Sequence, residues 1–421
     1  MKDIVVIGFA LFAMFFGAGN LIFPPYLGVI SGTDWLIGFL GFVLADVGLA
    51  LLAILAAAKC NGNVTKIISR AGEKFSIVLG SAIMICLGPL LAIPRTAATT
   101  FEMGVQPLFE GFSPVLVSVI FFIMTYILTI KPSKVVDIIG SILTPALLIG
   151  LGVLIIKGII TPIGEISQGA MIDDVFANGV GQGYQTMDAL GAVALSTVII
   201  TAITDRGYKT SSEKISVAFK AGLVAGLGLC LVYGGLTFLG ATVCSMYDID
   251  ASRTALMVDI TSTLLGGPGK IVLSIIVTLA CLTTSVGLVS ATAQYFAKIT
   301  DNKLKYEVTV TVVCIFSAIV SNFGVDSIIK FSGPILDMIY PATVVLVILT
   351  LFTDYIKNDN VFKGATYTAL LVSTLTIINN LGIVSLPMLS KLPFASLGFN
   401  WILPVLIGAL IGNFIPSKAK N

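Results

Sequence analysis

The chain has 421 residues, of which 57% are hydrophobic and 11% are charged, and its mean hydropathy is +1.04. Soluble domains carry about a quarter charged residues, so this composition excludes an ordinary water-soluble fold. The net charge of +2 gives no indication of a nucleic-acid partner. Histidine is absent, which removes the commonest metal ligand and general base. The composition predicts an all-α integral membrane protein over residues 1–421, with no separate soluble domain and no resident cofactor.

Apolar runs long enough to cross a bilayer as helices recur along the chain. We expect twelve spans, numbered here in chain order, at residues 4–29, 35–58, 76–101, 113–130, 135–160, 172–204, 215–244, 268–298, 308–323, 331–354, 364–385 and 397–415. If the N-terminus is inside, 17 of the 24 lysines and arginines fall in inside segments. Positive residues favour the cytoplasmic side. We therefore predict a multi-pass protein of the plasma or inner membrane with both termini in the cytoplasm.

Span 1 contains an interruption, Gly17-Ala18-Gly19-Asn20, followed by Phe23-Pro24-Pro25. Glycine inside a helix is less favourable than alanine by about 1 kcal/mol. Small residues also occur where membrane helices pack closely, which is the structural alternative. The spacing of these glycines does not form one smooth helix face, so we favour a functional break.

Span 6 contains a second interruption, in which three glycines between Gly179 and Gly183 precede a polar cluster from Tyr184 to Asp188. The alternative is an external loop over residues 172–186 with the helix starting at Met187. Even then Asp188 lies near the membrane, where a carboxylate is costly and is a candidate for function.

The two interruptions lie five spans apart, at corresponding positions of two five-span units. Glycine-interrupted spans in corresponding positions indicate a transporter binding site. Because five is odd, the two units have opposite orientation, at residues 1–160 and 161–354, and residues 355–421 add spans 11 and 12. Half-helix ends suit a zwitterion, since free N–H groups hold a carboxylate and free carbonyls hold an ammonium or Na⁺. Phe15 and Met187 are among the apolar residues around the breaks, and such a lining favours an apolar amino acid.

Span 8 contains adjacent hydroxyls at Thr283, Thr284 and Ser285. Hydroxyl oxygens suit a hard cation, but serine and threonine commonly bond to carbonyls of their own helix. The two interpretations have similar weight. No Walker A sequence occurs, so any energy for transport is expected from an ion gradient.

The motif Gly17-Ala18-Gly19-Asn20-Leu21-Ile22-Phe23-Pro24-Pro25, together with Gly183-Tyr184-Gln185-Thr186-Met187-Asp188, strongly resembles the branched-chain amino acid:cation symporters, the BrnQ-type carriers of the amino acid–polyamine–organocation superfamily. The resemblance covers essentially the whole chain. It implies the leucine-transporter fold, with two inverted five-helix repeats and helices 1 and 6 unwound at mid-membrane. It also implies uptake of leucine, isoleucine and valine across a bacterial cell membrane by alternating access.

The resemblance also implies site residues. Substrate binding is expected at the two helix breaks, by Phe15, Gly17, Ala18, Gly19, Asn20, Tyr184, Gln185, Thr186, Met187 and Asp188. A Na⁺ site is expected between helix 1 carbonyls and helix 8 hydroxyls, at Ala13, Phe16, Ala280, Thr283 and Thr284. The chain departs from the best-known sodium symporters of this fold in two ways. It lacks a basic residue before Phe23-Pro24, and it has Asp188 where they have an apolar residue.

Sodium is the favoured coupling ion, with H⁺ as the alternative, because a proton route would need Asp46, Asp188 or Asp337. The partners expected are branched-chain amino acids, the coupling ion and the lipid bilayer, with no obligate protein partner. A membrane-embedded enzyme lacks support, since no HExxH occurs, no GxSxG occurs in any span, and none of the three aspartates lies in a local catalytic motif. A passive channel is a further alternative, which ion-uncoupled flux would reveal.

Overall fold

The computed structural model describes residues 2–130 and 135–416, and this part of the chain contains helices and no strand. Lys131, Lys134, Lys418 and Lys420, which enter the charge count above, lie outside the described residues. The α-helices are α1 (Lys2–Phe15), α2 (Ala18–Ser31), α3 (Trp35–Val43), α4 (Leu49–Lys59), α5 (Val64–Ser69), α6 (Glu73–Ile85), α7 (Ala92–Thr99), α8 (Pro114–Ile130), α9 (Val135–Ile160), α10 (Val175–Thr186), α11 (Asp188–Ala194), α12 (Ser196–Asp205), α13 (Ser211–Ala241), α14 (Arg253–Ile299), α15 (Tyr306–Val320), α16 (Val325–Leu351), α17 (Asp359–Asn380) and α18 (Ile402–Phe414).

Short 3₁₀ and π-helical turns join or interrupt these helices. Three of them are π-helical: η2 (Leu44–Gly48) falls inside expected span 2, η3 (Cys86–Leu90) falls inside expected span 3, and η4 (Thr100–Val105) begins at the end of span 3 and extends past it. Five are 3₁₀ turns, namely η1 (Gly32–Asp34), η5 (Cys244–Met246), η6 (Ser321–Phe323), η7 (Leu389–Lys391) and η8 (Ala395–Leu397).

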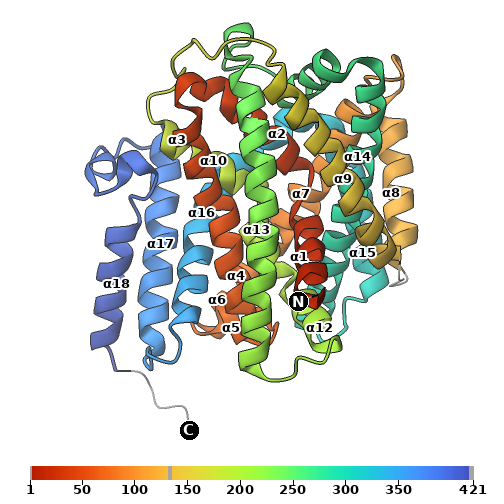
Figure 1. Cartoon of the computed structure of the whole chain (residues 1–421). Helices are drawn as coiled ribbons and strands as arrows, with labels where there is room; N and C mark the ends of the chain where they lie inside the picture. Colours follow the sequence, from red (N-terminus) through yellow and green to blue (C-terminus); the bar gives the residue numbers. More distant parts are fainter. Residues whose placement is uncertain (1, 131–134, 417–421) are drawn as a thin grey trace.

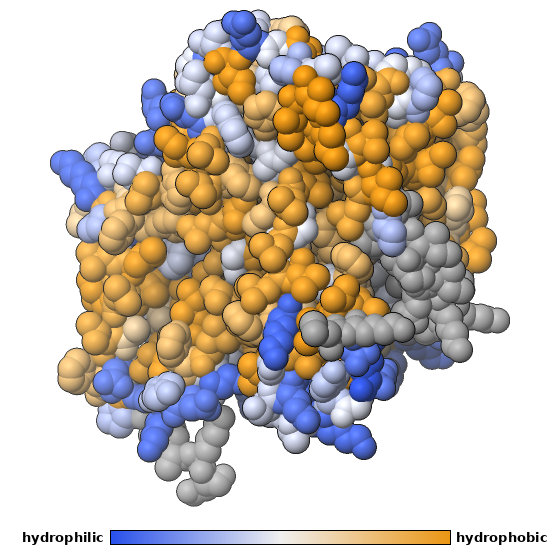
Figure 2. Space-filling model, viewed as in Figure 1, coloured by the Kyte–Doolittle hydropathy of each residue, from blue (hydrophilic) through white to orange (hydrophobic). Residues whose placement is uncertain are grey.

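The helices run broadly alongside one another in a bundle, and the start of α1 and the end of α18 lie toward the same end (Figure 1). Among the described residues, seven helical stretches are long and apolar enough to cross a membrane, and eight if the bent pair Val175–Ala194 and Val198–Asp205 counts as one span. Shorter apolar helices occur at Asp3–Phe15, Pro114–Ile130, Leu147–Ile160 and Ile402–Phe414. On the face drawn in Figure 2, hydrophobic residues form a broad band across the middle of the molecule, and hydrophilic residues gather toward its two ends. This surface is that of a multi-pass membrane protein.

Both helix interruptions expected from the sequence are present. Phe16 and Gly17 separate α1 from α2, and Met187 separates α10 from α11. Two further breaks were not expected. The third span is interrupted at Gly88-Pro89, and α14 is kinked at Gly266, where φ is +65° two residues before Pro268. Proline removes a helical donor and Gly266 takes a conformation that favours glycine, so both breaks have local causes.

Several helix contacts are so close that a side chain would not fit. A Cβ on Gly28 of α2 would meet the Thr237 carbonyl of α13, and one on Gly240 would meet the Pro25 carbonyl. In the same way a Cβ on Gly179 of α10 would meet the Gly38 carbonyl of α3. Small residues permit such approach between membrane helices. These contacts hold the two broken spans, 1 and 6, against their neighbours α13 and α3.

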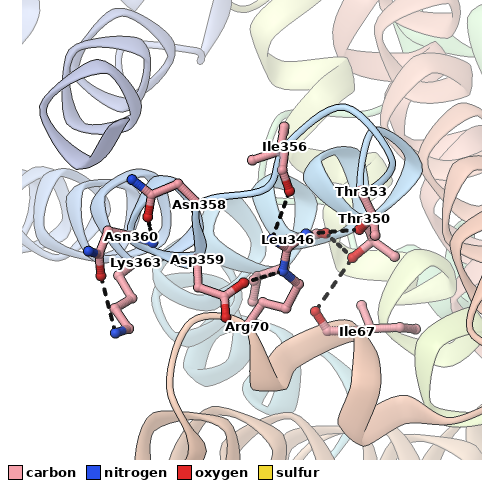
Figure 3. Close-up of polar contacts among 10 residues, drawn as sticks. All are labelled: Ile67, Arg70, Leu346, Thr350, Thr353, Ile356, Asn358, Asp359, Asn360 and Lys363. Carbon is pink, nitrogen blue, oxygen red and sulfur yellow. Dashed lines mark hydrogen bonds and ion pairs between the residues drawn. The ribbon is translucent and has the colours of Figure 1, made fainter. Parts of the chain in front are cut away.

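A polar cluster ties the short helix α5 to the α16–α17 connection (Figure 3). Arg70 Nε donates to Asp359 Oδ1 at 2.6 Å and Arg70 Nη2 donates to the Ile356 carbonyl at 2.8 Å. The guanidinium also lies 3.9 Å from the ring centroid of Phe362. Nearby, Lys59 pairs with Asp354 at 2.6 Å. The cluster fastens the loop after span 2 to spans 10 and 11.

Candidate substrate and ion site

The break between α1 and α2 is organised by Asn20. Phe16 N donates to the Phe12 carbonyl at 2.8 Å, but the next amide, on Gly17, donates to Oδ1 of Asn20 at 3.1 Å. The α1 ladder therefore stops, and its last carbonyls lose donors from their own helix. Helix α2 begins at Ala18 with the positive end of its dipole facing the break. The break presents carbonyl oxygens on one side and N–H groups on the other.

The break between α10 and α11 is made by Met187. Its φ of +69° places this non-glycine residue in the left-handed region, where α10 ends and α11 starts at Asp188. Such residues are uncommon and cluster at functional sites. The break turns the carbonyl end of α10 and the N-terminal end of α11 toward the break in span 1.

Arg95, on α7, lies between the two breaks. Its Nη1 donates to the Gln185 carbonyl at 2.7 Å, and this bond caps the C-terminal end of α10. A Cβ on Gly19 would lie 2.8 Å from Nη2, so the guanidinium also lies over the start of α2. Arg95 is 3% exposed. The sequence analysis did not assign it a role, although a basic residue inside a span is itself a signal of function.

A buried polar network joins four spans next to the breaks. Asn20 Nδ2 donates to Asp188 Oδ2 at 2.9 Å and also contacts the Tyr233 hydroxyl of α13. Thr186 Oγ1 donates to Asp46 Oδ1 at 2.7 Å. Asp46 lies in the π-helical turn η2, and such turns are frequent at functional sites. The network therefore links α2, α10, α11 and the middle of the second span.

A small cavity of about 40 Å³ lies where the breaks meet. It is lined by residues of both helix breaks and by residues of the third, sixth and eighth spans: Met14, Phe15, Gly17, Ala18, Gly19, Asn20, Leu87, Ala92, Arg95, Thr96, Thr186, Met187, Asp188, Gly191, Leu195, Thr284 and Leu288. Typical ligand sites measure several hundred Å³, so the helices are closely packed around this one.

Eight of the ten substrate-binding residues expected from the sequence line this cavity, and Tyr184 and Gln185 do not. The Tyr184 ring stacks on Tyr340 of α16 with ring centroids 4.3 Å apart. Gln185 Oε1 accepts from Ser332 Oγ at 3.0 Å, and Gln185 lines a separate outer cavity. Both side chains point from α10 toward α16 because they lie on the face of α10 that packs there.

The five residues expected at a Na⁺ site come from α1, the first break and α14. Among them, Thr283 Oγ1 donates to the Ala280 carbonyl of its own helix at 2.9 Å. Thr284 differs, because its hydroxyl is buried, has no hydrogen-bond partner among the described residues, and lies 3.2 Å from where a Cβ on Gly17 would be. Thr284 is therefore the hydroxyl that faces the end of α1, where Ala13 and Phe16 lie.

A wider cavity of about 550 Å³ lies toward the ends of α10, α14 and α16, and is lined by residues including Asp173, Gln182, Gln185, Lys330 and Asp337. Gln185 lines this outer cavity, and the next residue, Thr186, lines the inner one.

Arg253 lines the same outer cavity and closes the approach from that side. Its guanidinium lies 4.0 Å from the Tyr26 ring centroid and pairs with Asp326 at 3.3 Å. The Phe23 ring lies near both arginines, with its centroid 6.0 Å from Arg253 and 5.3 Å from Arg95. Arg253 lines the outer cavity and Arg95 lines the inner one, so Phe23 contacts one residue of each.

Solved structures with the same fold are membrane transporters. An inward-facing structure of Mhp1 matches with a TM-score of 0.64 at 14% identity, over 97% of this chain and 90% of that one. MhsT in complex with L-phenylalanine matches with a TM-score of 0.58 at 17% identity, over 97% and 98%. The chain therefore belongs to the leucine-transporter fold class of these structures.

The whole sequence identifies the family. Residues 1–419 match the model of the branched-chain amino acid transport proteins, and the chain belongs to that family. It is 37% identical to the branched-chain amino acid permease BraB of Bacillus subtilis, over 100% of this chain and 98% of that protein. It is 34% identical to the permease BrnQ of the same organism, over 97% and 96%. These relatives are named permeases and not enzymes. The family match confirms the resemblance found in the span 1 and span 6 motifs.

Proposed function

We propose that the chain takes up leucine, isoleucine and valine into the bacterial cell by cation-coupled symport, with Na⁺ as the favoured ion. The observation that carries this proposal is the inner cavity, where opposed helix ends surround a mostly apolar space. The N–H groups at the start of α2 and the Arg95 guanidinium suit a carboxylate. The free carbonyls at the end of α1 suit an ammonium group, and Phe15 and Met187 suit an aliphatic side chain.

The ion is proposed to bind between the end of α1 and Thr284. An unpaired buried hydroxyl is costly unless a further partner satisfies it, and a Na⁺ ion would accept that oxygen as a ligand. The carbonyls of Ala13 and Phe16 and of Ala280 are the other ligands proposed. Thr283, whose hydroxyl bonds to its own helix, would contribute less.

Alternating access is proposed to open and close the inner cavity on its two sides. Phe23, Gln185 and the Arg253–Asp326 pair are the residues proposed to move on the side of the outer cavity when substrate enters. The proposed topology has twelve spans, two inverted repeats at residues 1–160 and 161–354, and cytoplasmic termini. Labelling single cysteines introduced at Lys66 and Lys391 with a membrane-impermeant reagent tests this, because only the second is expected to react from outside.

Transport is tested by labelled leucine uptake into proteoliposomes that hold the purified full-length protein, under separate Na⁺ and H⁺ gradients. We expect uptake to follow the Na⁺ gradient, and isoleucine and valine to compete while lysine does not. Gly19→Leu is expected to abolish uptake, since its side chain would extend into the space next to Arg95. Uptake that follows only a pH gradient would overturn the choice of ion, and flux without any gradient coupling would indicate a channel.

A further inference from the structure

Two aspartate side chains meet beside the inner cavity. Asp46 is fully buried and Asp188 is 6% exposed. Their carboxyl groups are within hydrogen-bonding reach of each other. An ionised carboxylate is only an acceptor, so two carboxyls form a hydrogen bond only when one of them carries a proton.

The neighbouring donors leave a place for that proton. Asn20 Nδ2 donates to Asp188 Oδ2 at 2.9 Å, and Thr186 Oγ1 donates to Asp46 Oδ1 at 2.7 Å. The Tyr233 hydroxyl is a third donor, within hydrogen-bonding reach of Asp46. None of these donors supplies the hydrogen for the contact between the two carboxyl groups themselves, which therefore needs a proton.

The charges around the pair also require one proton. Arg95, buried beside the same cavity, acts electrostatically on Asp188 and contributes one positive charge. Two ionised carboxylates would leave this buried group with a net negative charge, and two protonated ones would leave it positive. The group is neutral with a single shared proton, and burying net charge is costly.

The other titratable groups facing the pair are uncharged at neutral pH. Tyr233 and Cys230 belong to α13, and Tyr340 belongs to α16. Tyr233 contacts Asn20, which donates to Asp188. These side chains do not replace the positive charge of Arg95, so the count of one proton for two carboxyls is unchanged.

We propose that Asp46 and Asp188 share one proton and form a proton-binding site of the transporter, distinct from the Na⁺ site proposed at Thr284. The proton joins the second span to α11 in the closed arrangement. Its loss would place two negative charges side by side and separate Asp188 from Asp46. This inference rests on the proposed function, because it assigns the proton to a transport site.

Infrared spectroscopy of the purified full-length protein tests the proton directly. A protonated carboxyl has its own C=O stretching band, which shifts in D₂O. We expect one such titrating band at neutral pH, and we expect Asp46→Asn and Asp188→Asn each to remove it, because each variant leaves one carboxylate opposite Arg95. Both substitutions preserve side-chain size, and size-exclusion profiles show which variant folds. Asp337→Asn, which alters a carboxyl in the outer cavity, is the matched control and should keep the band.

The outcomes separate the proton pair from the transport proposal. No band in the unaltered protein, or a band that survives both asparagine substitutions, overturns the shared proton. A band that appears only when Na⁺ is removed overturns it as well, since Na⁺ then occupies the position between the carboxyls. Leucine uptake is measured on the same preparations. Lack of leucine uptake together with the expected band would refute the proposed function and leave the proton pair standing.

Discussion

Gly191 offers a steric test of the inner cavity that leaves the fold intact. It lies on α11 and lines the cavity, and a Cβ at this position would meet no atom within 4 Å. The first carbon of a Gly191→Leu side chain therefore displaces no neighbour, and the rest of the side chain enters the space that we assign to substrate. Glycine in a helix interior is less stable than other residues by up to about 1 kcal/mol, which offsets part of the cost of packing the larger side chain, so we expect the variant to fold.

The expected loss of transport follows from the size of the cavity. Overpacking of a closely packed site costs about 1–3 kcal/mol, which corresponds to a roughly 5- to 150-fold loss of leucine affinity. The assay is leucine binding and uptake in proteoliposomes, with Gly152→Leu as the control. Gly152 is also helical with open space at its Cβ, but it lies on α9 and does not line the cavity. Equal uptake by the Gly191 and Gly152 variants would refute the assignment of this cavity to the substrate.

Three further predictions concern the ion site, helix packing and the Arg70 cluster. Thr284→Val should raise the Na⁺ concentration for half-maximal uptake by about 10- to 100-fold, and Thr283→Val should change it much less; equal effects would contradict the proposed ligand. Gly240→Leu should remove most of the folded protein from the membrane fraction, because its side chain would overlap the backbone of α2; normal amounts by immunoblot would show that α2 and α13 can separate. Arg70→Ala should lower the free energy of unfolding by about 1.5–3 kcal/mol through loss of charged hydrogen bonds, measured by thermal unfolding in detergent, and Arg70→Lys should recover only part of it because lysine lacks the planar fork.

Local sequence features located both helix breaks, but they did not show which residue makes the turn in span 6. The polar cluster after Gly183 correctly located the interruption in span 6, but the chain turns at Met187 and not at a glycine. Gly179 and Gly183 serve a different purpose, since a Cβ on either would meet the backbone of the second span. Composition marks where a helix is unusual, whereas the partner helix decides whether a glycine is a hinge or a contact.

Long-range partners of the site left no local pattern to find. Arg95 and Asp46 come from spans without an evident motif, and each acquires its role from residues of span 6 that lie far along the chain. The π-helical turn that holds Asp46 has no recognisable signature in Leu44–Gly48. Each was visible only as a charged residue inside a span, which is a reason to examine it and not enough to pair it.

The packing also indicates which parts of the site can separate. Helix α10 lies against the second span through Gly179 and Gly183, where backbones touch and no side chain intervenes. Helix α2 lies in the same way against α13 through Gly28 and Gly240. Across the site itself, by contrast, α2 and α11 are joined by the Asn20–Asp188 hydrogen bond, and a single hydrogen bond contributes far less than a packed helix interface. We therefore expect a rearrangement that opens the inner cavity to break this bond before it breaks either glycine contact.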